Sequence, residues 1–180
     1  MAILDFLPQI LDALIKEKTP FALTGGLASN LWLPDEQVRE TFDIDFAVPA
    51  GWSPDQLATS LRAPPMLAMR GADLNLRRAE IKRLVVENIV VDFVSVKSAP
   101  FMKEVFARVQ TGRLAGRPLP VLSPEDIFVF KAISKRERDI QPMSALATTA
   151  EFDRKHAEKW CRKFGVWLFA ARALKSQRTK

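Results

Sequence analysis

Two apolar segments of the chain carry aspartates at positions where a folded protein places its core. Residues 41–48, TFDIDFAV, alternate as a β-strand does, so Asp43 and Asp45 project from one face, about 7 Å apart at the backbone. Asp92 lies in the middle of IVVDFVSV at residues 89–96, a second predicted strand. A buried carboxylate is costly unless it is paired or binds a metal ion, so the fold has to supply a counter-charge.

The spacing of these aspartates leaves two interpretations open. In one, they lie at an exposed strand end and pair with Arg39 or Lys97. In the other, they bind a hard divalent cation, and a set of purely acidic ligands suits Mg²⁺, or Mn²⁺ in its place. Two such ions would activate an attacking hydroxyl and stabilise a leaving pyrophosphate.

The hydrophobic pattern changes period along the chain and predicts an α/β (α+β) fold, a short mixed β-sheet flanked by helices, with C-terminal helices. Helices are expected over residues 2 to about 17, 27–33, about 101–110, from Ser53 to before Pro64, and from Ser123 to the end. Strands are expected at 20–24, 41–48, 65–70, 76–86, 89–96 and 118–122, with turns at 71–73 and 87–88.

The last predicted helix carries one stripe of apolar side chains, which is typical of a core face: Phe152, His156, Trp160, Phe164, Trp167, Leu168, Ala171 and Leu174. His156, the only histidine, is therefore expected to be a packed or half-exposed structural residue. One histidine and one cysteine leave almost no material for a zinc site or a histidine-based triad. Cys161 has no disulfide partner, which indicates a reducing compartment.

The 180 residues predict one domain, in which residues 1–122 form a core with an N-terminal helix and residues 123–180 a basic helical region packed on it. Charge follows this division. Residues 1–130 hold 14 basic and 16 acidic groups, net −2, whereas residues 131–180 hold 13 basic and 5 acidic groups, net +8. Such a segment suits a polyanion such as an RNA or tRNA end, and it is equally compatible with a solvated helix face.

Neither a signal peptide nor a membrane span is expected. Asp5, Pro8 and Asp12 interrupt the N-terminal apolar run, and no stretch of about 18 uncharged apolar residues occurs. The sequence therefore predicts a cytoplasmic protein with no membrane partner.

Gly25-Gly26 follows a predicted strand and precedes a predicted helix. Without Cβ atoms the backbone can approach a ligand closely, and a helix N-terminus offers free N–H groups to phosphate oxygens. A glycine pair is also found in ordinary turns, so its function depends on the residues around it.

The combination of Gly25-Gly26, Arg39-x-Thr41-x-Asp43-x-Asp45 and a later aspartate is more specific than any of its parts. It resembles the nucleotidyltransferase superfamily of DNA polymerase beta, and in particular the minimal nucleotidyltransferases and the AbiEii-type toxins of toxin–antitoxin pairs. Residues 122–131, LSPEDIFVFK, and the pair Arg138-Asp139 also match that branch. The resemblance covers about residues 20–140.

The resemblance implies a nucleotidyltransferase fold and roles for individual residues. Asp43 and Asp45 would hold the metal ions, and Asp92 would complete the metal site and accept the proton of the acceptor hydroxyl. The nucleoside triphosphate (NTP) would be bound by Gly25, Gly26 and Lys131, with Arg39 and Thr41 either steering phosphate or bracing the strand. Lys135 and Arg138 are further candidates, or residues of a solvated face.

The sequence departs from the family pattern in three places. Sixteen residues separate Gly26 from Asp43, more than in the tightest members. Gly26 stands where many members have serine, so a hydroxyl contact to phosphate is absent or comes from Thr24 or Ser29. Pro142 breaks or restarts a helix after the Arg-Asp pair. No departure removes a metal ligand.

The resemblance therefore implies an Mg²⁺-dependent enzyme that transfers NMP from an NTP to an acceptor hydroxyl, such as an RNA or tRNA end, a small molecule or a protein side chain. The alternative of another class is a non-catalytic nucleotide- or partner-binding module, for example one that binds an antitoxin protein. A purely structural protein would require the aspartates and the glycine pair to coincide by accident.

Overall fold

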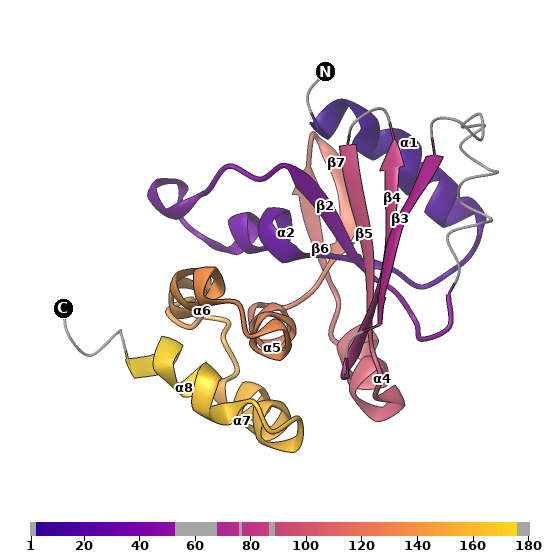
Figure 1. Cartoon of the computed structure of the whole chain (residues 1–180). Helices are drawn as coiled ribbons and strands as arrows, with labels where there is room; N and C mark the ends of the chain where they lie inside the picture. Colours follow the sequence, from indigo (N-terminus) through magenta and orange to yellow (C-terminus); the bar gives the residue numbers. More distant parts are fainter. Residues whose placement is uncertain (1–2, 53–67, 76, 87–88, 176–180) are drawn as a thin grey trace.

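A computed structural model of the chain describes residues 3–52, 68–75, 77–86 and 89–175. Its centre is a seven-stranded mixed sheet in the order β3-β4-β5-β2-β1-β7-β6, with helices packed around it (Figure 1). The expected α/β fold with a mixed sheet is confirmed.

The strands are β1 (Ala22–Thr24), β2 (Asp43–Ala47), β3 (Ala68–Asn75), β4 (Ala79–Val86), β5 (Ile89–Val96), β6 (Gln110–Leu114) and β7 (Arg117–Val121). β2 pairs with β5 and β1 with β7 in parallel, and the other neighbours are antiparallel. The parallel β2–β5 pair lies at the centre of the sheet, so both segments that carry the aspartates are adjacent there.

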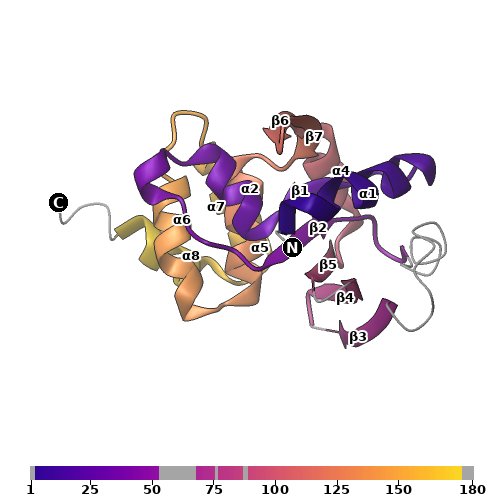
Figure 2. The same cartoon turned by 90° about the horizontal axis from the view of Figure 1, so that it is seen from above.

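The helices are α1 (Ile3–Lys16), α2 (Gly25–Trp32), α4 (Ala99–Ala107), α5 (Pro124–Ser134), α6 (Ile140–Leu146), α7 (Arg154–Lys163) and α8 (Trp167–Lys175). Short 3₁₀ turns, η1 (Asp35–Gln37) and η2 (Glu137–Asp139), precede β2 and α6. The helices α5 to α8 gather at one side of the sheet, away from β3 and β4 (Figures 1 and 2). No helix in the described part of the chain combines the length and apolarity needed to cross a bilayer.

One hydrophobic core runs through the sheet and into the C-terminal helices. Phe46 of β2 and Phe93 of β5 stack with their ring centroids 5.9 Å apart, and both are fully buried. α5 is buried almost throughout, with Phe128 fully enclosed. α5 packs against α2, α6, α7 and α8, so it is the central helix of this side of the protein.

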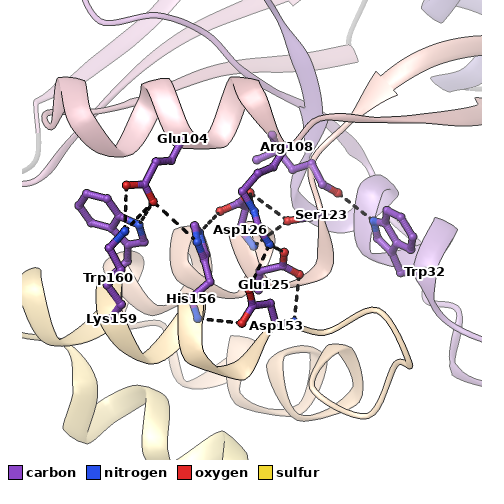
Figure 3. A network of polar contacts seen from close by, with 11 residues as sticks. Trp32, Glu104, Arg108, Ser123, Glu125, Asp126, Asp153, His156, Lys159 and Trp160 are labelled. Carbon is purple, nitrogen blue, oxygen red and sulfur yellow. Dashed lines mark hydrogen bonds and ion pairs between the residues drawn. The ribbon is translucent and has the colours of Figure 1, made fainter.

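A network of buried polar groups joins α4, α5 and α7 (Figure 3). The Asp126 carboxylate, which has no exposed surface, accepts a hydrogen bond from Ser123 Oγ at 2.9 Å and contacts His156 Nε2 at 2.8 Å. Glu125 pairs with Arg108, which follows α4. His156 is thus a packed structural residue, as its place on the apolar stripe predicted.

Several predicted boundaries are wrong. Residues 71–73, expected as a turn, lie inside β3, and the predicted helix over 101–110 ends at Ala107. The segment after it forms the hairpin β6–β7, whose two central residues, Ala115 and Gly116, have φ values of 50° and 76°. Two consecutive positive φ angles match the twist of a tight hairpin, a pairing that hydrophobic periodicity does not reveal.

The prediction that one last helix carries the whole stripe from Phe152 to Leu174 is also wrong, because Gly165, with φ at 62°, separates α7 from α8. The break rotates the second half of the stripe, and Leu168 is 86% exposed instead of buried. The helix predicted from Ser53 to before Pro64 and the start of the strand at 65–70 lie outside the described residues.

Candidate active site

The turn between β1 and α2 forms one wall of the site. Gly25 begins α2 with φ at 67°, a left-handed conformation that favours glycine, and a Cβ there would overlap the Asp45 carboxylate. A Cβ on Gly26 would lie 2.5 Å from Cγ2 of Thr41. Gly25 is therefore required by its backbone conformation and by the close approach of Asp45, and the side chain of Thr41 lies against the turn at Gly26.

The three aspartates converge on one face of the sheet. In the parallel β2–β5 pair Asp45 lies directly opposite Asp92, and Asp43 is two residues before Asp45 on the same face. One carboxylate oxygen from each lies within 4.8 Å of the others. Asp92 is 6% exposed and lies in the middle of its strand, so the interpretation as an exposed strand end is wrong for this residue.

Burial and the neighbouring carboxylates raise the pKa of Asp45. Burial, followed by the neighbouring charges of Asp43 and Asp92, raises the pKa of Asp45 to about 7, and the more distant Lys131 and Arg136 only partly offset this. A carboxylate in such a place binds a proton or a cation near neutral pH.

Asp92 has a direct partner in Arg83 of β4. Arg83 Nε and Nη2 donate to Oδ1 and Oδ2 of Asp92, both at 2.7 Å, in a bidentate ion pair. The antiparallel register places Arg83 opposite Asp92, so Asp45, Asp92 and Arg83 form a row across three strands.

Cations of the segment from α5 to η2 also line the cleft. The buried Lys131 Nζ lies 3.4 Å from Asp139 Oδ1, and Arg136 Nε lies 2.7 Å from Asp139 Oδ2, which also accepts from Ser134 Oγ at 3.0 Å. Although burial acts to raise the pKa of Asp139, the charges of Lys131 and Arg136 outweigh it and hold that pKa below its usual value. Asp139 therefore stays ionised and orients both cations.

The loop before β2 is clamped onto α2. The Asn30 side chain donates to the backbone oxygen of Arg39 at 2.7 Å and accepts from its backbone nitrogen at 3.1 Å. These two hydrogen bonds resemble those between paired strands, and they fix the path of the chain into Asp43. Arg39 thus has its backbone anchored while its side chain is exposed.

These walls enclose a cleft of about 1550 Å³, lined by the predicted site residues Gly25, Gly26, Arg39, Thr41, Asp43, Asp45, Asp92, Lys131 and Arg138. Lys135 is not among the lining residues. Instead, it ends α5 in a left-handed conformation with φ at 53°.

One feature other than the aspartates fits a metal-bound phosphate ligand. Thr24 Oγ1 is buried beside the cleft and has no hydrogen-bond partner within the described part of the chain, whereas Ser29 Oγ donates to Gly25 O at 2.7 Å. The Thr24 hydroxyl is therefore the available donor.

The separation of the three carboxylates also fits one metal ion. Oxygens bound to one Mg²⁺ at about 2.1 Å lie up to about 4.2 Å apart, so small rotations of side chains whose oxygens now lie within 4.8 Å would bring all three carboxylates to one ion.

Sequence reasoning missed Arg83 and Arg136. Arg83 is one of several cations in a predicted strand, and only the register of β4 against β5 shows that it faces Asp92. Arg136 follows the end of α5 and reaches the cleft because the chain turns back there. Neither position carries a local pattern that separates it from a solvated cation.

Comparison with protein-family models and with curated proteins gave no match. Among solved structures, the fold is similar to the solution structure of the antibiotic-resistance factor ANT(2'')-Ia, with a TM-score of 0.55 and 20% identity over 97% of this chain and 92% of that one. It is also similar to an antigenic nucleotidyltransferase-like protein from Paracoccidioides brasiliensis, with a TM-score of 0.52 and 19% identity over 94% and 92% of the two chains. The chain therefore has the fold of nucleotidyltransferases.

Proposed function

We propose that the protein is a metal-dependent nucleotidyltransferase that transfers NMP from an NTP to an acceptor hydroxyl. The observation that carries this proposal is the convergence of Asp43, Asp45 and Asp92 at a cleft that is also lined by a glycine turn and a pair of oriented cations. Anionic ligands for a divalent cation and cationic groups for phosphate thus face the same space.

The binding roles follow from the walls of the cleft. The backbone of Gly25-Gly26 and the Thr24 hydroxyl would bind the triphosphate, because this turn is open to close approach and has an unused donor. Lys131 and Arg136 would neutralise its β- and γ-phosphates from the opposite side. Mg²⁺, or Mn²⁺, held by the three aspartates would neutralise the phosphate oxygens and lower the pKa of the attacking hydroxyl.

In the transfer step, the acceptor oxygen attacks the α-phosphorus of the NTP and forms a new P–O bond. The bond between the α-phosphorus and the bridging oxygen breaks, and pyrophosphate leaves with that electron pair. Asp92 would accept the hydroxyl proton and pass it to solvent. Lys131 and Arg136 would stabilise the charge that develops on the pyrophosphate.

An RNA end is the acceptor that the charge distribution favours. α7 exposes five basic side chains, Arg154, Lys155, Lys159, Arg162 and Lys163, and packs against α5, which carries Lys131. Lys159 and Arg162 also pair with Glu104 and Glu158, so only part of this charge is free of local partners.

Membership of the minimal and AbiEii-type branch, and with it an antitoxin partner, stays a prediction from the motif at residues 39–45.

The test is incubation of the protein with each α-labelled NTP, Mg²⁺ and bulk cellular RNA, followed by gel analysis. We expect a labelled RNA band that needs Mg²⁺ and is lost in Asp43→Asn, which removes one metal ligand. Asp35→Asn is the matched control, since Asp35 is exposed on η1 and does not line the cleft.

The remaining outcomes separate the alternatives. Label on a small-molecule or protein acceptor would keep nucleotidyl transfer and remove the RNA proposal. Nucleotide binding without transfer to any acceptor would favour the non-catalytic module. Equal turnover by Asp43→Asn and the wild-type protein would contradict the assignment of the site.

A further inference from the structure

The Arg83–Asp92 pair places a guanidinium on the third carboxylate of the cluster. Both carboxylate oxygens of Asp92 are engaged at 2.7 Å, so the group is fully paired without a metal ion. Within the described residues, Asp43 and Asp45 make no direct ion pair. The counter-charge in direct contact with the cluster therefore comes from Arg83.

We propose that Arg83 is a positioning residue that holds Asp92 in the metal-free protein and yields a carboxylate oxygen when the divalent cation enters. Two cations then compete for one carboxylate, and Arg83 limits the affinity of the cluster for the metal ion. This inference rests on the proposed function, because it concerns the same metal site.

The two partners differ in their freedom to move. Asp92 is 6% exposed and fixed in the middle of β5, with strands paired on both of its sides. The Arg83 side chain is 39% exposed and lines the cleft, so its long stem can swing into open space. Arg83 is therefore the partner that can withdraw.

We expect the divalent cation to replace the Arg83 guanidinium on Asp92, and we do not expect Arg83 to dissociate from Asp92 first. A buried carboxylate left without a partner is costly, so Arg83 has little reason to leave Asp92 until another cation replaces it. The guanidinium also repels a divalent cation at Asp43 and Asp45. These two effects act in the same direction, because each weakens metal binding while Arg83 is in place.

A purely structural role for Arg83 makes the opposite prediction. If Arg83 served only to orient Asp92 for the metal ion, its removal would leave Asp92 misplaced and would weaken metal binding. The direction in which the metal affinity changes therefore separates the two roles.

The experiment is a titration of the protein with Mn²⁺ in the absence of nucleotide, with free Mn²⁺ measured by electron paramagnetic resonance. We expect Arg83→Gln to bind Mn²⁺ roughly tenfold more tightly than the wild-type protein, as expected for removal of one positive charge several ångströms from a divalent ion. Arg138→Gln is the matched control, because Arg138 lines the same cleft and makes no contact with Asp92. Its effect should stay within about twofold, because an exposed, more distant charge is screened.

A double-mutant cycle assigns the effect to the pair. In the Asp92→Asn background only the repulsion between the guanidinium and the ion remains, so Arg83→Gln should increase Mn²⁺ affinity by a clearly smaller factor than it does when Asp92 is present. If Arg83→Gln does not fold, Arg83→Lys keeps the charge but loses the bidentate fork, and it should bind Mn²⁺ more tightly than the wild-type protein by a smaller factor.

Unchanged or weaker Mn²⁺ binding by folded Arg83→Gln or Arg83→Lys would overturn the inference. The proposed function would stay intact if the wild-type protein binds Mn²⁺ and Asp43→Asn abolishes that binding. Absence of Mn²⁺ binding in the wild-type protein and in every Arg83 variant would overturn the inference, and the labelled-NTP assay would then decide the proposed function separately. Binding that appears only when Arg83 is replaced would support the inference most strongly.

Discussion

At the scale of single residues, Asp45 links the charge of the cluster to pH. Its pKa is raised to about 7 from a usual value of 3.8 by burial and by Asp43 and Asp92. At a pH between these two values, Asp45 in the metal-free protein is therefore protonated in the folded state and ionised in the unfolded state. Asp45 should therefore make the metal-free protein less stable as pH rises from about 4 to 7.

The same proton has to leave when a metal ion binds. We expect the apparent affinity for Mg²⁺ to fall by about tenfold for each pH unit below 7, and to be nearly constant above 8. Calorimetric titration at pH 6 in two buffers of different ionisation enthalpy should detect close to one released proton per Asp45 site. Equal affinities at pH 6 and pH 8 would contradict the raised pKa.

Gly25 is the second residue that its position in the site constrains. Gly25→Ala adds a Cβ that overlaps the Asp45 carboxylate and also strains a backbone with φ at 67°. We expect a loss of about 1–2 kcal/mol from the free energy of unfolding, together with a loss of Mn²⁺ binding as Asp45 is displaced.

Gly116→Ala is the control for Gly25→Ala. Gly116 has φ at 76°, and a Cβ there meets nothing within 4 Å. This variant should lose a similar amount of stability, measured by chemical denaturation, and keep its Mn²⁺ binding. Normal Mn²⁺ binding by Gly25→Ala would show that the close approach of Gly25 to Asp45 is not required.

At the scale of elements, the strands that carry the aspartates were predictable and their partners were not. The alternation at residues 41–48 and the apolar run at 89–96 predicted both strands, and i, i+2 spacing predicted that Asp43 and Asp45 share a face. The pairing of Arg83 with Asp92 depends on register between separate strands, which side-chain patterns do not encode locally. The strand at 118–122 was predicted and corresponds to β7, whereas β6 and its hairpin with β7 were missed, since the turn depends on backbone angles at Ala115 and Gly116.

The buried network of Figure 3 determines how α7 attaches to the rest of the protein. His156→Ala removes the partner of one carboxylate oxygen, Oδ1, of the fully buried Asp126, so we expect a loss of about 3 kcal/mol in the free energy of unfolding. Lys159→Ala, on the same helix, breaks an exposed pair with Glu104 and should cost under about 1 kcal/mol. Urea denaturation of both variants measures the difference, and equal losses would contradict a structural role for the His156–Asp126 contact.

At the scale of the whole molecule, the cleft lies between the sheet and the C-terminal helices. The sheet supplies the aspartates and the glycine turn, and the segment from α5 to α6 supplies Lys131, Arg136 and Asp139. We propose that residues 1–122 form the core and residues 123–180 a basic helical region packed on it. In that arrangement the metal ligands and the phosphate-binding cations belong to different regions, and the nucleotide would bridge them.

The sequence predicted in part that the metal ligands and the phosphate-binding cations come from different regions. Lys131 was identified because it lies in a motif shared with known nucleotidyltransferases, and it does line the cleft. The role of Asp139 in orienting Lys131 and Arg136 was not predicted, because it requires the chain to turn back after α5 and place η2 beside the helix end. Long-range packing, and not local propensity, determines that geometry.

The central claim is that the three aspartates bind the metal ion of a bound NTP. The most direct measurement is an anomalous diffraction map from crystals grown with Mn²⁺ and an NTP analogue that cannot be cleaved at the α–β bond. We expect an anomalous peak among Asp43, Asp45 and Asp92, with the triphosphate between the Gly25-Gly26 turn and Lys131. A map with nucleotide bound elsewhere, and no peak at the three aspartates, would contradict it.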